Sequence, residues 1–203
     1  MLSRIFIPSL VGLLLIIALQ PFMAQAAVES GPKKLGEFSG WEAYQAKQGH
    51  HSTCYMILRP SSMDYKMPPS NKIETKVKLK SKDKKSPEQN LSTPKRSNVY
   101  VMVTLRPEES MNPVISYRSG YGFKQSSEVL VNAGDKSFNL FTEKDQAWAR
   151  NTAMDVQVTN ALRKAKRIII QGVSNDGGKS SDTFIPQGAE SAYKAIAKAC
   201  GIS

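Results

Sequence analysis

The sequence is poor in the side chains that catalysis and metal binding use most. Its 203 residues include two histidines and two cysteines. The histidines, His50 and His51, are adjacent, and the nearest carboxylates in the sequence are those of Glu42 and Asp64. A serine hydrolase needs a positioned histidine and an acid that orients it, and the sequence contains no nucleophile-elbow motif. We therefore predict that the protein is not an enzyme, with no catalytic residues and no cofactor.

Long hydrophobic runs are also scarce, and the strongest lies at the N-terminus. A positive charge at Arg4 precedes an apolar run over residues 5–19, and small residues at Ala24 and Ala26 follow it. This layout is typical of a cleaved secretory signal peptide. The alternative is an uncleaved anchor, but Pro8 shortens the run to about a dozen strongly apolar residues, and a membrane span needs about 20. We predict export, cleavage after Ala26, and a mature chain of 177 residues without a transmembrane span.

The two cysteines both lie in the predicted mature chain. In an oxidising compartment such a pair favours one disulfide bond, Cys54–Cys200. The bond closes a loop of about 147 residues, for which the chain-entropy argument gives a stabilisation of roughly 5 kcal/mol as an upper bound. Two buried free thiols are the alternative. His50, His51 and Cys54 also form a weak zinc or copper pattern. An oxidised Cys54 offers no thiolate, so we predict no metal site and interpret the histidines as an exposed turn.

Acidic residues are few, and the positive charge is concentrated. The chain has 17 Asp and Glu against 28 Lys and Arg, a net charge of +11, and residues 72–96 alone contribute +6. Low hydrophobicity and like charge argue against a packed core in this stretch, so we predict a disordered basic insertion over about residues 61–97. Its cations are candidate polyanion-binding residues: Lys72, Lys76, Lys78, Lys80, Lys82, Lys84, Lys85, Lys95 and Arg96.

The rest of the mature chain predicts a single, mainly β domain over residues 38–203, preceded by a flexible leader at 27–37. Alternating or β-branched stretches predict about eight strands joined mostly as antiparallel hairpins. Helical spacing over residues 152–166 and 189–199 predicts one inserted helix and one C-terminal helix. We expect an α+β domain, with an antiparallel β-sandwich or barrel-like sheet. The predicted strands lie at residues 41–46, 54–58, 98–105, 114–117, 128–131, 137–141, 167–173 and 181–185.

Several short motifs, taken in order, resemble the invasion associated locus B family. They include Trp41, Cys54-Tyr55, Asn98-Val99-Tyr100, Arg106-Pro107, Gly120-Tyr121, Phe138-Asn139-Leu140-Phe141-Thr142, Ala147-Trp148-Ala149-Arg150, Asp182-Thr183-Phe184 and Ala199-Cys200-Gly201. The resemblance implies an exported protein of Gram-negative bacteria, and some members are linked to adhesion to host cells or invasion of them. It implies neither catalytic residues nor a cofactor. The long basic insertion is a departure from the more compact members.

The sequence thus predicts a periplasmic or cell-surface protein that acts by binding. A basic insertion attracts anionic glycans, lipid headgroups or nucleic acid; export makes nucleic acid the least suitable of these, and we predict no nucleic-acid partner. The same charge can also serve merely to keep a loop solvated. An envelope or host protein is a further candidate partner. The alternative function is that of a periplasmic structural or stress-related protein that acts through protein–protein contact.

Overall fold

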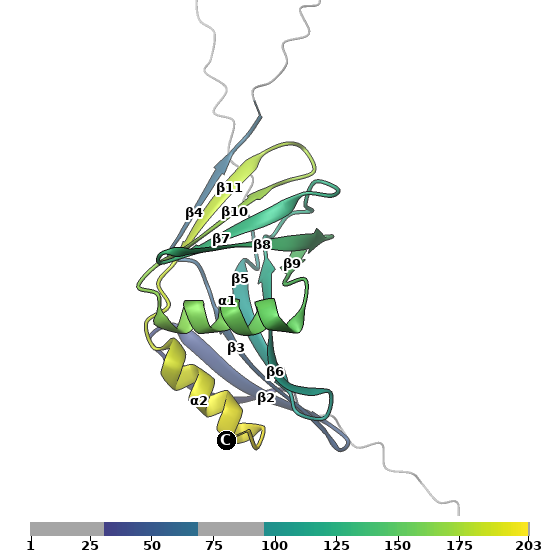
Figure 1. Ribbon diagram of the computed structural model, residues 1–203, viewed down its shortest axis with the longest axis vertical. Coiled ribbons are helices and arrows are strands. Elements are labelled where there is room, and N and C mark those ends of the chain that lie inside the picture. Colours follow the sequence, from purple (N-terminus) through teal and green to yellow (C-terminus); the bar gives the residue numbers. More distant parts are fainter. Residues whose placement is uncertain (1–30, 69–95, 203) are drawn as a thin grey trace, which may run out of the picture.

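The described residues form eleven strands and two helices (Figure 1). The structure is a computed structural model, and it describes residues 31–68 and 96–202. The helices are α1 (Thr152–Lys164) and α2 (Ala189–Ala199). The strands are β1 (Lys33–Phe38), β2 (Trp41–Gln48), β3 (His51–Leu58), β4 (Ser62–Lys66), β5 (Tyr100–Arg106), β6 (Ser110–Arg118), β7 (Glu128–Ala133), β8 (Lys136–Glu143), β9 (Gln146–Trp148), β10 (Ile168–Val173) and β11 (Lys179–Phe184).

All eleven strands belong to one antiparallel sheet. Their order is β1-β2-β3-β5-β6-β9-β8-β7-β10-β11-β4, so β1 and β4 are its edges. Because these two edges do not pair with each other, the sheet is not a closed barrel. The prediction of a mainly β, antiparallel domain with an inserted and a C-terminal helix is confirmed, and the sheet is a single open one.

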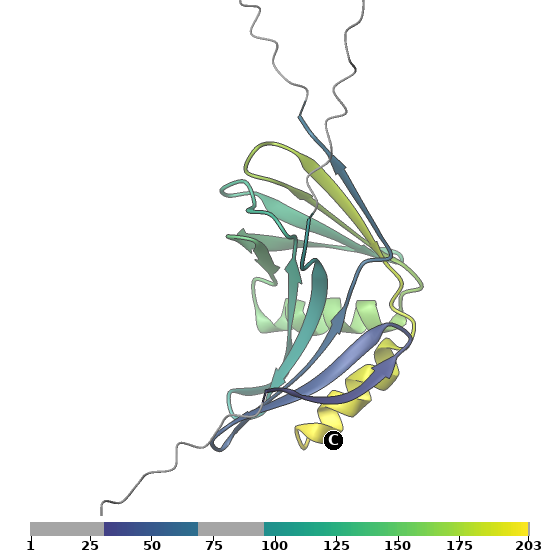
Figure 2. The ribbon, with the colours of Figure 1, turned by 180° about the vertical axis from the view of Figure 1, so that it is seen from behind.

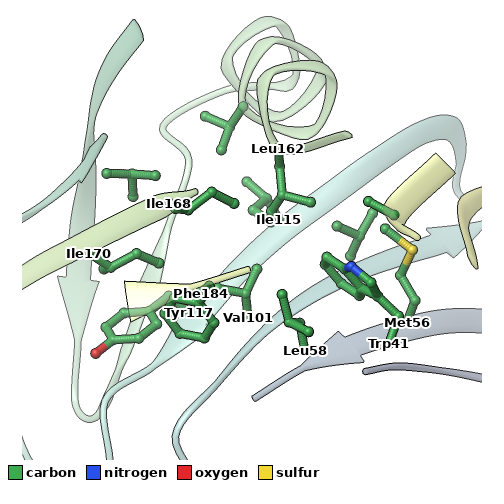
Figure 3. Close-up of a cluster of buried hydrophobic side chains, with 14 of the residues drawn as sticks. Trp41, Met56, Leu58, Val101, Ile115, Tyr117, Leu162, Ile168, Ile170 and Phe184 are labelled. Atoms are coloured by element: carbon green, nitrogen blue, oxygen red, sulfur yellow. The ribbon is translucent and has the colours of Figure 1, made fainter. Parts of the chain in front are cut away.

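The sheet curls around its own core. β6 and β11 are five places apart in the strand order, yet Tyr117 of β6 packs edge-on against Phe184 of β11, with 6.3 Å between ring centroids. The view from behind shows the two ends of the sheet swept toward one side (Figure 2). Both rings are almost fully buried, and Val101 and Ile170 complete this part of the core (Figure 3).

Helix α1 packs on β6 through its apolar stripe. Asn151 caps the helix by accepting a hydrogen bond from the Met154 amide at 2.9 Å, which satisfies one of the free N–H groups of the first turn. The Asp155 carboxylate accepts the Ile115 amide of β6 at 2.8 Å. Leu162, in the last turn, is buried beside Ile115 and the β10 core (Figure 3). The helix is therefore held at both ends.

Helix α2 covers β1, β2 and β3. Trp41 of β2 is fully buried beneath it and donates its indole N–H to the Pro186 carbonyl at 3.3 Å. The helix starts after Gly188, whose φ of +83° is a conformation that side chains rarely adopt. A Cβ there would collide with the Phe38 carbonyl at the end of β1, so the first turn of α2 can approach β1 only with glycine at this position.

Two sequence-based boundaries were wrong, both at the edges of the sheet. The leader predicted over residues 27–37 contains most of β1, in which Leu35 and Phe38 pack against the core. Part of the insertion predicted from residue 61 is a strand, because Ser62–Lys66 form β4 and pair with β11; its residues 69–95 lie outside the described ranges. Edge strands expose much of their surface, so their composition is polar and the hydrophobic pattern is weak. The short strand β9 lies at residues 146–148, between the strand predicted at 137–141 and the helix predicted from residue 152.

Candidate functional site

The predicted polyanion-binding residues separate into two groups. Eight of the nine, the lysines from Lys72 to Lys95, lie outside the described residues. Arg96 is described, and its side chain is 4% exposed. A buried guanidinium cannot act as part of an exposed basic surface, so Arg96 does not share the role predicted for the lysines. Its position instead defines a polar cluster inside the domain.

Arg96 forms a bidentate ion pair with Asp182 of β11. Its Nη1 donates to Asp182 Oδ2 at 3.0 Å, and its Nη2 donates to Oδ1. The same Nη1 donates to the Ser119 carbonyl at 3.1 Å. The Tyr117 hydroxyl also donates to Asp182, whose side chain is fully buried. Three hydrogen-bond donors therefore surround one carboxylate. A buried charge has to be paired and hydrogen-bonded in this way, because it has lost its contacts with water.

Tyrosine rings flank the buried guanidinium. The carbon at its centre lies 5.8 Å from the ring centroid of Tyr65 and 5.5 Å from that of Tyr121, within the range of cation–π attraction. Burial raises the pKa of Tyr121 to about 12. Burial also raises the pKa of Tyr117, and the nearby Asp182 carboxylate raises it further. Both hydroxyls stay protonated at neutral pH; that of Tyr117 donates to Asp182, and that of Tyr121 lies 2.6 Å from Ser180 Oγ.

A second group of polar side chains holds Tyr65 of β4. Its hydroxyl donates to Asp176 Oδ1 at 2.8 Å and lies 2.7 Å from Ser174 Oγ. The Ser174 hydroxyl, the Gly178 amide and the Tyr65 hydroxyl all donate to Asp176, and they hold its pKa below the usual range. A Cβ on Gly178 would collide with the Tyr65 hydroxyl. The β10–β11 turn is thus shaped to receive this tyrosine.

We call Tyr65, Arg96, Tyr117, Tyr121 and Asp182 the stem cluster, because it holds the chain on both sides of residues 69–95. Tyr65 lies three residues before Pro68, where the described part stops, and Arg96 is where it resumes. The two residues come together across the cluster. The polar groups of this cluster have hydrogen-bond partners inside the domain, so the cluster is suited to anchoring the chain rather than to binding a ligand.

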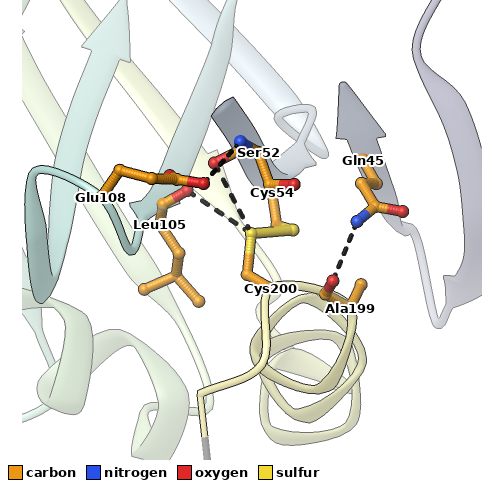
Figure 4. The surroundings of a disulfide bond; sticks show 7 residues. All are labelled: Gln45, Ser52, Cys54, Leu105, Glu108, Ala199 and Cys200. Atoms are coloured by element: carbon orange, nitrogen blue, oxygen red, sulfur yellow. Dashed lines mark hydrogen bonds between the residues drawn. A yellow bond between two sulfur atoms is a disulfide. The ribbon is translucent and has the colours of Figure 1, made fainter. Parts of the chain in front are cut away.

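The disulfide Cys54–Cys200 fixes α2 to β3 (Figure 4). The two Cα atoms are 6.0 Å apart across a sequence separation of 146 residues. Next to the bond, Gln45 of β2 donates to the Ala199 carbonyl at 2.8 Å, and the Ser52 amide donates to a Glu108 carboxylate oxygen at 2.9 Å. The predicted pairing is confirmed, and the end of α2 is tied to the sheet by a covalent bond and a hydrogen bond.

The histidines lie where the sequence placed them, at an exposed turn and the start of β3. Cys54, the third member of the weak metal pattern, is in the disulfide. Within residues 31–68 and 96–202, no group of three His, Cys, Asp or Glu side chains is arranged to hold a metal ion. In the same ranges no helix has the length and apolar character of a membrane span.

Sequence reasoning missed the buried partners of Arg96. The sequence did contain a signal for one partner, Asp182. Ser180, Asp182 and Phe184 alternate along β11 and share its buried face. A carboxylate therefore occupies a position where the strand period predicts an apolar side chain. A buried carboxylate needs a cation. No local pattern identifies Arg96 as that cation, since it lies 86 residues away in sequence.

The fold and the disulfide together define a class: a mainly β domain in which an open antiparallel sheet carries a covalently tethered C-terminal helix. No family model and no curated protein sequence matches the chain. Among solved structures it is similar to the invasion associated protein b of Bartonella henselae, with a TM-score of 0.52 over 82% of this chain and 96% of that one. The identity is 12%, so this likeness shows a related fold and nothing about activity.

Proposed function

We propose that the protein is exported and acts in the cell envelope or at the cell surface as a non-catalytic binding protein. Its basic segment, with the eight lysines from Lys72 to Lys95, would bind anionic glycans or lipid headgroups. The disulfide supports an oxidising, extracytoplasmic location. The fold related to that of an invasion associated protein supports a role in adhesion or invasion. On this proposal, the exported protein starts at Ala27.

The observation that carries the proposal is the stem cluster. The protein holds the chain before and after the basic segment with a buried ion pair and two tyrosine rings. A buried pair of this kind is expensive to form and costly to break, so it is a firm attachment for a charged segment. The described part of the protein is itself basic, with 19 Lys and Arg against 13 Asp and Glu, so it adds to the attraction of a polyanion rather than opposing it.

The experiment is binding of the purified mature protein to immobilised heparin and to lipopolysaccharide over a salt series. The test variant replaces the eight lysines by glutamine and keeps Arg96, since removing that residue would damage the fold. If the segment binds polyanions, the wild type is retained to high salt and the variant elutes early, because each lost contact reduces the salt dependence. Equal elution of the two proteins would refute a role for the segment.

Protein–protein contact is the second candidate function, and the outer edge of β4 favours it. This strand pairs with β11 on one side and forms the edge of the sheet on the other. Met63 in the strand and Met67 just after it are 49% and 38% exposed, and exposed methionines are common at adaptable binding surfaces. Capture of an envelope protein by the wild type but not by a Met63→Lys variant would favour this function.

A further inference from the structure

We propose that the folded domain carries a second polyanion site, formed by Lys136, Lys164, Lys166 and Arg167, which binds the sulfate or phosphate groups of an anionic glycan. We call these four residues the helix-end patch. The inference deepens the proposed function and rests on it in part, since it assigns the same class of ligand. It differs in that every residue of the site belongs to the described, folded part of the protein.

Two elements far apart in the sequence form the patch. Ile168 of β10 pairs with Ala133 of β7, and this antiparallel register brings the connection before β10 beside the β7–β8 turn. Lys136 is the first residue of β8 after that turn, and the end of α1 with the connection that follows supplies the other three cations. Figure 1 shows the C-terminal end of α1 beside this turn. All four side chains are exposed.

Two of the patch residues, Lys136 and Lys164, line a shallow recess. Gly134, Lys136, Asn160 and Lys164 line it, together with Asp135, and its volume is about 160 Å³. Sites for small-molecule ligands usually measure about 300–1,000 Å³, so the recess is too small for such a ligand. It suits a single anionic substituent, with the rest of a polymer lying across the neighbouring cations. Asp135 reduces the net charge of the site to +3.

The nearby Arg163 differs from the patch cations because its side chain already has partners. Arg163 donates to Glu190 of α2 and lies over the Tyr193 ring, 4.2 Å from its centroid. It therefore joins the two helices and is occupied. The four patch cations form no ion pair with any residue in the described ranges.

The helix dipole accounts for only one of the four patch cations. It favours cations in the last turn of a helix, which explains Arg163 and Lys164. Lys166 and Arg167 lie beyond the end of α1 at Lys164, and Lys136 lies on β8. Because like charges brought together repel one another, an unpaired cluster of this kind is favoured when an anionic partner neutralises it.

The test compares three variants with the wild type by calorimetric binding of a size-defined heparin oligosaccharide. The patch variant is K136Q/K164Q/K166Q/R167Q. The matched control, K33Q/K47Q/K124Q/K179Q, removes four exposed cations that are spread over the domain. The segment variant has the eight lysines replaced. For the patch variant we expect a loss of affinity of about tenfold or more. The slope of the logarithm of its binding constant against the logarithm of salt concentration should be smaller in magnitude by about three. For the control we expect a loss of affinity of at most about threefold.

Equal losses in the patch variant and the control would show a general charge effect and overturn the proposal. The two proposals fail separately: a loss in the segment variant alone refutes the helix-end patch, and a loss in the patch variant alone refutes the basic segment. A wild type that does not bind refutes both. Lipopolysaccharide as a second ligand distinguishes phosphate from sulfate as the natural group. A patch effect seen with phosphatidylglycerol vesicles and absent with both glycans would refute a glycan ligand.

Folding of the patch variant is checked independently of binding. Its substituted side chains are exposed, so its unfolding midpoint should match that of the control. Amide chemical shifts of the wild type provide a readout that needs no substitution. Heparin should perturb the amides of residues 134–136 and 160–167 first, and perturbation confined to other parts of the domain would contradict the assignment.

Discussion

The buried pair between Arg96 and Asp182 makes a sharp prediction for Asp182→Asn. The substitution keeps the shape of the side chain but leaves the guanidinium without a counter-charge, at a site where the two side chains are 4% and 0% exposed. Removing one partner of a buried pair usually costs about 3–5 kcal/mol. A domain of this size has a total stability of about 5–15 kcal/mol, so the variant should unfold at a much lower denaturant concentration.

The magnitude is measured by urea unfolding of the oxidised protein, next to a matched exposed pair. Arg150 and Glu128 also form an ion pair, but their side chains are 52% and 41% exposed, and such pairs are worth about 0–1 kcal/mol. We therefore expect Glu128→Gln to be almost neutral. If Asp182→Asn costs no more than Glu128→Gln, the stem cluster is not the desolvated anchor that its geometry indicates.

Two further variants separate charge from shape. Arg96→Lys keeps the positive charge but loses the planar fork and its stacking between tyrosine rings, so it should remain clearly destabilised. The double variant Arg96→Met/Asp182→Leu removes both charges, and replacement of a buried pair by apolar side chains is often neutral or stabilising. It should recover most of the stability lost in Asp182→Asn. A double variant as unstable as the single one would show that packing or the Tyr117 hydroxyl left without its acceptor, not the unpaired charge, causes the loss.

The remaining predictions concern the disulfide, one glycine and one tyrosine. Replacing Cys54 and Cys200 by serine should lower the free energy of unfolding by up to about 5 kcal/mol, and the mass of the wild type should rise by about 2 Da on reduction. Gly188→Ala should cost clearly more than Gly49→Ala: both glycines have positive φ, but Gly49 has open space around it, so comparing their unfolding curves isolates the clash with β1. The pKa of Tyr121 is raised to about 12, so its contribution is complete below pH 10 and is lost as pH rises from about 10 to 12. Tyr121→Phe should weaken that pH dependence of unfolding, and an unchanged slope would contradict it.

The sequence predicted the helices and the central strands well, because both have strong periodic signals. The stripe from Ala189 to Ala199 matches α2 residue for residue. The other helix was expected to reach residue 166 and ends at Lys164, since Ala165 has an extended backbone. The two cysteines, together with the predicted export, favoured the disulfide over two free thiols. In each case the information is local, or the alternatives are few.

The edge strands and the curl of the sheet were not predictable in the same way. β4 gains its structure from pairing with β11, more than 110 residues later in the chain, and its own residues are mostly polar. That pairing depends on the curl, which brings β6 and β11 to a common core. Periodicity along one segment carries no information about which distant segment completes it.

In the candidate site, too, the local sequence did not reveal a distant partner, although the type of residue at position 96 was informative. The basic run contains nine cations, of which eight are lysine and one is arginine. Counting charge treats them alike, and on that basis Arg96 belonged with the lysines. Physical chemistry does not treat them alike, because a guanidinium binds a carboxylate with two parallel hydrogen bonds, stacks on aromatic rings and is less strongly hydrated than an ammonium group. The arginine at the end of the run is therefore the cation that suits a buried ion pair, and Asp182 at an apolar position of β11 is its complement.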